Sequence, residues 1–268
     1  MHPILFDFGG FTIYAYGVLL AAAYLLGLQF ALVRARPRGL DRQLVMDLGI
    51  WIIISALVGA KLLLLIVDFK EFKGNPSALF SLARSGGVFY GGLIAAVVVA
   101  LLYLRQHKMP LWPTTDVFAP GIALGHVVGR FGCLLAGCCF GRPASVPWAI
   151  TFRNPDAQPQ GTPLGVPLHP TQLYEAGAEA LILVFLLVLE RRGRPFPGRT
   201  FWSYMLLYGV SRFIIEFYRG DNRGMVFDLV STSQFVSIIL VPLSIVMLVV
   251  LSRRPDPTRQ AAAQRAAA

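Results

Sequence analysis

Long apolar segments alternate with short polar connections along most of the chain. Seven of these segments are long enough to cross about 30 Å of hydrocarbon, which takes roughly 20 residues in a helix. They lie near residues 12–33, 44–67, 87–104, 116–136, 171–190, 200–218 and 230–252. The pattern predicts an all-α integral membrane protein with seven transmembrane helices.

Residues 137–170, between the fourth and fifth predicted helices, form the longest connection expected outside the cytoplasm. They contain seven prolines: Pro143, Pro147, Pro155, Pro159, Pro163, Pro167 and Pro170. Proline inside a helix removes a hydrogen bond and clashes with the preceding turn, which excludes a continuous helix. We therefore expect a small extracytoplasmic cap, irregular or β-rich, within a single transmembrane domain over residues 1–254. Residues 255–268 are expected to form a flexible cytoplasmic tail.

Composition and charge agree with a membrane protein. Apolar residues make up 56% of the 268 residues and charged residues only 14%, whereas soluble domains carry about 25% charged residues. The net charge of +10 comes mainly from Lys and Arg concentrated in alternate connections. Cytoplasmic loops carry such residues, so the N-terminus is expected outside and the C-terminus in the cytoplasm. The charge therefore indicates the lipid bilayer as a partner and no nucleic acid.

Three basic residues, Lys61, Arg130 and Arg212, lie inside the predicted helices. A cation at this depth costs about 2.5–3.5 kcal/mol unless water, a partner or a bound anion receives it. Arg212, Glu216 and Arg219 share one helix face. An Arg212–Glu216 ion pair would then leave one positive charge unpaired. Arg130 stands among glycines, and we expect its guanidinium to bind a phosphate or carboxylate.

Other polar residues accompany these arginines. His126 lies one helical turn before Arg130, and we prefer a hydrogen bond to a backbone carbonyl over a role as a base. Glu175 and Glu179 lie at the start of the fifth predicted helix, after Thr171, which we expect to be its N-cap. The two carboxylates either pair with the arginines or interact with the helix dipole.

The third predicted helix begins with Tyr90 beside Gly91 and Gly92. Glycine lets the backbone come close to a ligand, which favours a site here. The alternative is that Tyr90 belongs to the aromatic belt at the membrane interface.

Cys133, Cys138 and Cys139 are the three cysteines of the chain. They are too few and too clustered for an extracellular disulfide framework. They act either as small apolar residues in the core, which we prefer, or as a redox pair of Cys133 with Cys138 or Cys139. The spacing offers no adequate zinc ligand set, so we expect no metal.

Several segments together resemble the prolipoprotein diacylglyceryl transferase family, over nearly all of the first 225 residues. They are Tyr14–Gly17, Tyr90–Ile94, Asp116 with Ala119-Pro120, Gly129–Gly132, His169–Glu175 and Arg212–Arg219. The resemblance implies a multi-pass enzyme of the bacterial cytoplasmic (inner) membrane. It also implies transfer of the sn-1,2-diacylglyceryl group from phosphatidylglycerol to the lipobox cysteine thiol of a preprolipoprotein signal peptide, with release of glycerol phosphate.

The resemblance assigns roles by motif. Arg130 would hold the phosphate of phosphatidylglycerol, Arg212 would be the second catalytic arginine, and Tyr90 would occupy a third catalytic position. The substrate-binding residues would be Tyr16, Gly91, Gly92, His126, Cys133, Gly141, His169, Glu175, Glu216 and Arg219. Positioned guanidinium groups stabilise the charge that grows on a leaving phosphate, so neither a metal nor an organic cofactor is expected.

The chain departs from the best-known members at three positions. Tyr90, Cys133 and Cys138 stand where those members have a histidine, an asparagine and an acidic residue. A phenol with a pKa near 10 is a poor base. Either proton removal is undemanding, or His126 or Glu216 performs it, or the substrate differs.

Two other functions fit the same sequence features. One is a non-catalytic lipid- or peptide-binding membrane protein, or a transporter, that uses the cationic cavity without turnover. The other is a related transferase with a different donor or acceptor.

Replacing Tyr90 with phenylalanine tests the phenol directly. If the hydroxyl orients the phosphate or moves a proton, Tyr90→Phe lowers the rate at which a lipobox peptide is lipidated. Full activity in this variant would eliminate the hydroxyl from proton transfer. A gain of activity in Tyr90→His would indicate that a base is missing.

Overall fold

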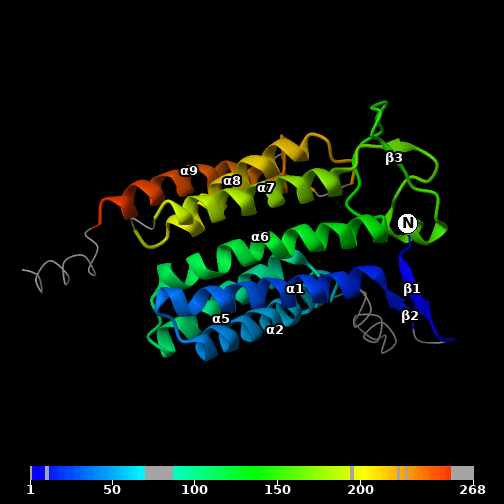
Figure 1. Cartoon of the computed structure of the whole chain (residues 1–268). Helices are drawn as coiled ribbons and strands as arrows, with labels where there is room; N and C mark the ends of the chain where they lie inside the picture. The colour runs from blue at the N-terminus through cyan, green and yellow to red at the C-terminus, as the bar shows by residue number, and fades with distance from the viewer. Residues whose placement is uncertain are drawn as a thin grey trace, which may run out of the picture. The chain divides into compact units, whose positions relative to one another are not determined.

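The computed structural model describes residues 2–9, 12–69, 87–193, 196–221, 224–226 and 229–254. Seven helices of 18 or more residues dominate this part of the chain (Figure 1). They are α1 (Ala15–Ala35), α2 (Arg42–Val67), α5 (Phe89–Gln106), α6 (Leu111–Ala136), α7 (Thr171–Arg191), α8 (Arg199–Glu216) and α9 (Thr232–Ser252). Each overlaps one predicted segment, so the expected all-α membrane architecture is confirmed. The expected tail, residues 255–268, lies outside the described residues.

Six of the seven helices are long and apolar enough to cross a membrane. The exception is α8, whose 18 residues include Arg199, Arg212 and Glu216. Large apolar side chains project outward from the other helices, among them Leu181, 74% exposed, and Leu102, 62% exposed. Such apolar exposure suits contact with lipid. The chain is therefore a multi-pass membrane protein.

The helices belong to two compact units, residues 1–30 with 115–268 (unit 1) and residues 31–114 (unit 2). In unit 2, α2 packs along α5. Their backbones come close at Gly59 and Gly91, where a Cβ on Gly59 would overlap the Gly91 carbonyl oxygen and the Ala95 side chain. Small residues at a crossing allow such an approach between membrane helices.

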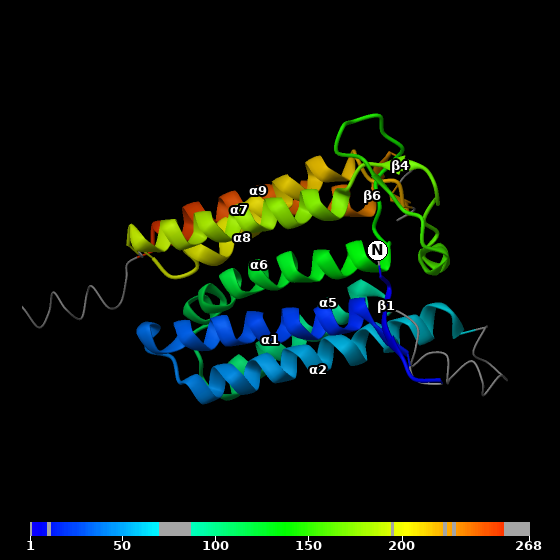
Figure 2. The same cartoon turned by 45° about the vertical axis from the view of Figure 1, so that its right-hand side comes forward.

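In unit 1, α6, α7 and α8 share a core, and α8 also packs along α9 (Figure 2). The core residues are Ala119, Ala123, Ile182, Leu186 and Tyr204. The first half of α1 meets α6 at a glycine pair, since a Cβ on Gly27 would lie 2.8 Å from the Gly121 carbonyl oxygen. This close approach of α1 and α6 accounts for a glycine at position 121.

The connection between α6 and α7 is mostly irregular. It contains the two-residue strands β3 (Ile150–Thr151) and β4 (Pro167–Leu168), which pair antiparallel, and the 3-10 helix η2 (Pro155–Gln160). Phe140, Phe152 and Leu168 form its small core. Five more short elements lie elsewhere in the described chain. β1 (Ile4–Asp7) pairs with β2 (Thr12–Tyr14), β5 (Met225–Val226) pairs with β6 (Val230–Ser231), and η1 (Arg36–Arg38) is a 3-10 turn. A cap over residues 137–170 is present, and its extracytoplasmic position stays a prediction, as does the single-domain organisation.

Asp116 of α6 fixes where α8 begins. Its carboxylate accepts hydrogen bonds from the backbone N–H groups of Gly198, at 2.7 Å, and Phe201, at 2.8 Å. The first N–H groups of a helix lack partners within the helix, and an acidic side chain satisfies them with favourable charge. Asp116 thereby holds the N-terminus of α8 against α6, although it lies far away in sequence.

The contact between α2 and α5 gives a stability prediction. We expect Gly59→Ala to lower the free energy of unfolding by about 1–3 kcal/mol, because the added methyl group must push the α5 backbone away. The matched control is Gly177→Ala in α7, where an added Cβ would meet nothing within 4 Å. Thermal unfolding of the purified chain in detergent would measure both variants. Equal stability of the two would contradict the close approach.

Candidate active site

Three guanidinium groups converge on the carboxylate of Glu175 in α7. Arg130 Nη2 lies 2.5 Å from Glu175 Oε2, while Arg219 Nη1 donates to Oε1 at 2.6 Å and Arg212 Nη1 approaches the same oxygen at 3.4 Å. Arg130 comes from α6, Arg212 from α8 and Arg219 from the turn after α8. One carboxylate therefore links three separate segments of unit 1.

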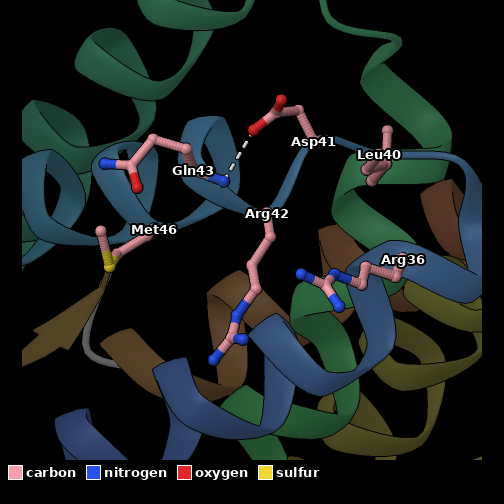
Figure 3. Close-up of a pocket in the computed structure, with 6 residues that line it drawn as sticks. All are labelled: Arg36, Leu40, Asp41, Arg42, Gln43 and Met46. Atoms are coloured by element: carbon pink, nitrogen blue, oxygen red, sulfur yellow. Dashed lines mark hydrogen bonds between the residues drawn. The ribbon is translucent and has the colours of Figure 1, made fainter.

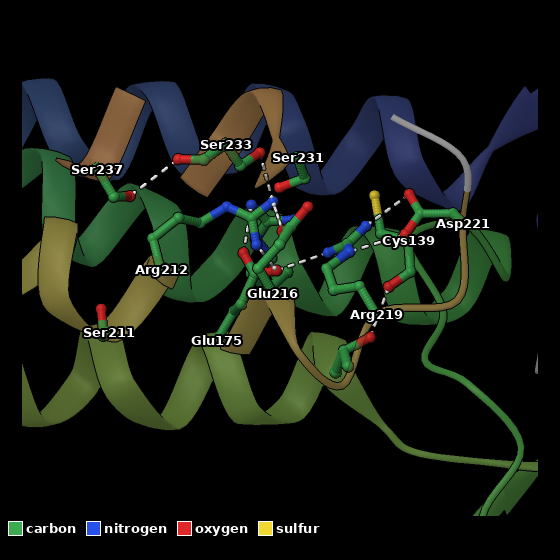
Figure 4. Close-up of polar contacts among 12 residues, drawn as sticks. Cys139, Glu175, Ser211, Arg212, Glu216, Arg219, Asp221, Ser231, Ser233 and Ser237 are labelled. Carbon is green, nitrogen blue, oxygen red and sulfur yellow. Dashed lines mark hydrogen bonds and ion pairs between the residues drawn. The ribbon is translucent and has the colours of Figure 1, made fainter. Parts of the chain in front are cut away.

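Two more carboxylates complete what we call the arginine–carboxylate cluster: Arg130, Arg212, Arg219, Glu175, Glu216 and Asp221. Arg212 Nη2 lies 2.5 Å from Glu216 Oε2 and 2.9 Å from the Ser233 hydroxyl of α9. Figure 4 shows Arg212 and Arg219 on either side of Glu175. The Arg212–Glu216 pair expected from the helical spacing is confirmed.

Arg219 is held by a two-point contact. Its Nε and Nη2 donate to the two oxygens of Asp221 at 2.8 and 2.7 Å. Burial lowers the pKa of Arg219, but the hydrogen bonds to Asp221 and the charge of Glu175 raise it by more, so its pKa lies above the usual value. The expectation that this helix face leaves one positive charge unpaired is therefore wrong, because Glu175 and Asp221 come from outside α8.

Arg130 is paired as well, and the protein itself supplies the carboxylate that its guanidinium binds. Its partner is Glu175 on another helix. With three arginines and three carboxylates, the described cluster is formally neutral. The side chains of Arg219 and Arg212 are 2% and 6% exposed, whereas that of Arg130 is 17% exposed. Arg130 is thus the most accessible guanidinium of the three.

His126 belongs to a second polar group one turn earlier on α6. Its Nδ1 lies 2.8 Å from Glu179 Oε1 and 3.0 Å from the Tyr204 hydroxyl, and its ring stacks on Tyr208. The expected backbone carbonyl partner is replaced by a buried carboxylate. Of the two carboxylates near the start of α7, Glu179 therefore pairs with His126 and Glu175 pairs with the arginines.

Gly141 lies where three chain segments cross. Its N–H donates to the His169 carbonyl at 3.1 Å, it forms a bridge with Arg219, and a Cβ here would overlap His169 and the Tyr218 carbonyl. His169 in turn contacts the Tyr174 hydroxyl through Nδ1, at 3.1 Å. Both residues thus position the turn that carries Arg219.

The three cysteines lie together at the C-terminal end of α6, and we call them the cysteine cluster. Their sulfur atoms are all within 4.8 Å of one another. Cys133 is buried on α6, while Cys138 and Cys139 follow the helix and are partly exposed. Tyr16 of α1 packs against the same stretch, since a Cβ on Gly132 would contact its ring at 3.4 Å. The structure therefore supplies a three-thiol group that the spacing alone did not indicate.

Tyr90, Gly91 and Gly92 belong to unit 2. Gly91 and Gly92 are buried against α2, where a Cβ on Gly92 would lie 2.7 Å from the Ala56 carbonyl oxygen. This packing accounts for both glycines without a ligand. Tyr90 is 37% exposed, and the role of all three in substrate binding stays a prediction.

A pocket of about 550 Å³ also lies in unit 2 (Figure 3). Its lining residues are Arg36, Leu40, Asp41, Arg42, Gln43 and Met46. Asp41 caps α2 by accepting from the Gln43 and Leu44 N–H groups at 2.7 and 3.1 Å. None of the predicted site residues lines this pocket.

Sequence reasoning missed several partners. Asp221 follows Arg219 by two residues, and that spacing was a usable signal. Ser233 and Tyr204 gave none, because tertiary packing alone brings them to the site. Thr171 was expected as an N-cap, but it is the first residue of α7, and its hydroxyl donates to the Cys139 carbonyl at 2.8 Å.

Comparisons with known proteins identify relatives along almost the whole chain. The model of the family described as prolipoprotein diacylglyceryl transferase matches residues 3–250. The chain is 37% identical over 245 residues to the phosphatidylglycerol–prolipoprotein diacylglyceryl transferase of Clostridium tetani, covering 91% of this chain and 96% of the relative. A similarly named protein of Aeromonas hydrophila is 31% identical over 263 residues, covering 95% and 92%.

The shared carboxylate gives the prediction for this site. Glu175→Gln removes the negative charge that three guanidinium groups share, and we expect it to lower the free energy of unfolding by about 3–5 kcal/mol. Asp221→Asn is the comparison variant, because Asp221 contacts only Arg219 among the described arginines and its side chain is 19% exposed. Thermal unfolding in detergent should show the larger loss for Glu175→Gln. The reverse order would contradict the central place of Glu175.

Proposed function

The chain belongs to the prolipoprotein diacylglyceryl transferase family, and we propose that its arginine–carboxylate cluster binds the donor headgroup during diacylglyceryl transfer. The chain is accordingly a membrane-embedded diacylglyceryl transferase. The proposed reaction moves the sn-1,2-diacylglyceryl group of phosphatidylglycerol to the lipobox cysteine of a preprolipoprotein. Glycerol phosphate leaves, and a thioether remains.

The observation that carries this proposal is the convergence of guanidinium groups on a single carboxylate. Arg130 and Arg212 reach Glu175 from two different helices. Both arginines lie within predicted transmembrane segments, where a charge is costly. Guanidinium groups bind phosphate and carboxylate with the same fork geometry. A phosphodiester can therefore compete with Glu175 for the same donors. Arg130 is the proposed point of entry because it is the most exposed of the three arginines.

The chemistry increases the charge that these arginines face. The acceptor sulfur attacks the glycerol carbon that carries the phosphate, and the carbon–oxygen bond breaks. The phosphate keeps the bonding electrons, and the acceptor loses its S–H proton. A phosphodiester carries one negative charge, whereas the phosphate monoester that leaves has a second pKa near 6 and approaches two. The guanidinium groups therefore stabilise the transition state more than the bound donor.

The geometry favours His126 over Glu216 as the acceptor of that proton. The Glu216 carboxylate is held in an ion pair by Arg212. His126 instead directs Nδ1 at Glu179, and a carboxylate in this position fixes the orientation of the ring. The side chain of His126 is 36% exposed, which gives its other nitrogen access to a substrate.

The remaining assignments follow the family. We propose that Tyr16 and Cys133 line the site at the end of α6, and that Gly141 and His169 shape it by fixing the turn at Arg219. Tyr90, Gly91 and Gly92 remain proposed substrate contacts. We place the enzyme in the bacterial inner membrane, as the family implies. We propose that the N-terminus and the cap lie outside and the C-terminus in the cytoplasm, because Lys and Arg concentrate in alternate connections and such connections face the cytoplasm.

A lipidation assay tests this function. The purified chain, phosphatidylglycerol vesicles and a lipobox peptide should yield a peptide whose mass has increased by one diacylglyceryl group on its cysteine. No increase with phosphatidylglycerol would contradict the proposal. A panel of other anionic phospholipids and acceptor peptides would reveal a related transferase with a different donor or acceptor.

Arginine variants in the same assay test the cluster. We expect Arg130→Ala and Arg212→Ala each to lower the rate by about 10²–10³, the usual cost of losing one donor to a developing oxyanion. The matched control is Arg153→Ala, whose side chain is exposed on the cap. Thermal unfolding of each variant separates lost chemistry from lost folding. Activity of a folded Arg130→Ala equal to that of the control would exclude Arg130 from phosphate binding.

A further inference from the structure

The cysteine cluster combines features that a merely space-filling group does not need. Three sulfur atoms from one helix end and the following turn lie within 4.8 Å of one another. The turn is held in an unusual backbone conformation, with φ values of 79° at Gly137 and 62° at Cys139. Left-handed backbone at a non-glycine residue is costly and persists only where the surrounding structure enforces it. Here it brings Cys138 and Cys139 back toward Cys133.

The start of α7 holds this turn rigidly. Gln172 Nε2 donates to the Cys138 carbonyl at 2.7 Å, and the Thr171 hydroxyl donates to the Cys139 carbonyl at 2.8 Å. The side chains of Thr171 and Gln172 are fully buried. The backbone that carries two of the thiols is therefore fixed by a second layer of polar contacts, as in metal sites whose ligands are oriented in advance.

We infer that Cys133, Cys138 and Cys139 bind one Zn²⁺ ion and leave its fourth coordination position open to the acceptor thiol. This revises the expectation, drawn from spacing alone, that the cysteines lack an adequate ligand set. Thiolates bind zinc at about 2.3 Å in tetrahedral geometry, which places sulfur atoms roughly 3.8 Å apart. The observed spread requires the three thiols to close by about 1 Å at most.

The surroundings suit the charge of such a site. Three thiolates and one Zn²⁺ carry a net charge of −1. Cys139 lies beside Arg219 in Figure 4, and Arg130 interacts electrostatically with both Cys133 and Cys139. A disulfide would use only two of the three sulfur atoms. The convergence of all three therefore favours a metal ion over a redox pair.

The open position deepens the proposed function, on which this step rests. Catalytic zinc sites have three protein ligands and one exchangeable position, and a thiol bound there is deprotonated. On coordination the acceptor cysteine would release its S–H proton to His126, the proton acceptor proposed above. Its sulfur would then attack the glycerol carbon as the carbon–oxygen bond to phosphate breaks, and the phosphate would leave with the bonding electrons. Such a site would generate the thiolate in a chain that has Tyr90 at the position of the usual histidine.

Metal binding can be measured without any substrate. The full chain, purified in detergent with a phosphine reductant, is freed of metal by a chelator and titrated with Zn²⁺ and, separately, with Co²⁺. We expect one zinc per chain by elemental analysis and a thiolate-to-cobalt charge-transfer band with the intensity of three thiolates. Cys139→Ser should weaken zinc binding by more than about 100-fold, since even contacts outside the ligand shell contribute 10–100-fold. Arg153→Ala is the control and should bind normally.

Two results would overturn the site. One is an intact mass lower by two hydrogens, which indicates a disulfide, in a chain that binds no metal after reduction. The other is three reduced thiols without metal binding, which indicates apolar packing. The cobalt spectrum of the unaltered chain keeps the test decisive if Cys139→Ser does not fold.

The lipidation assay then tests whether the acceptor thiol binds the zinc ion during the reaction. Removal of zinc should slow lipidation at neutral pH, with recovery when zinc is restored and a smaller loss at high pH, where the acceptor thiol ionises unaided. A chain that binds zinc but lipidates equally well without it would overturn coordination of the acceptor. A zinc-loaded chain that lipidates no peptide would instead contradict the proposed function, while the metal titration still decides the site.

Discussion

The arrangement of unit 1 depends on the sharing of one carboxylate among three guanidinium groups. Glu175 reaches Arg130 on α6, Arg212 on α8 and Arg219 beyond α8. Isolated charges are expensive in a membrane, but a connected set with equal numbers of both signs is tolerated. The ion pairs therefore determine which helices must be neighbours. The apolar core of α6, α7 and α8 packs between the helices that these ion pairs bring together.

The same sharing explains how a stable site can also bind a substrate anion. A cluster of arginines alone would repel itself before any donor arrived. Glu175 provides a negative charge for the resting protein, and a phosphate can replace part of that role during turnover. Arg219, held by Asp221 at two points, is the anchored member of the set, whereas Arg130 is the exposed one.

The sequence was informative where the physics is local. Apolar length predicted all seven long helices of the described chain, and the spacing of four predicted the Arg212–Glu216 pair. It failed where partners meet through tertiary packing. No local pattern connects Arg130 with Glu175 or His126 with Glu179, because each pair joins two helices. The sequence did not predict the cysteine cluster for a related reason, because the cluster requires the left-handed backbone at Cys139.

The polarity of α8 has a consequence for how the protein is made. A segment with three charges in 18 residues gains too little from lipid to leave the translocon by itself. Its partners are already synthesised when it emerges, since Asp116 and Glu175 precede it in the chain. Membrane integration of α8 should therefore be cooperative, with α6 and α7 acting as an intramolecular chaperone for the helix that completes the site.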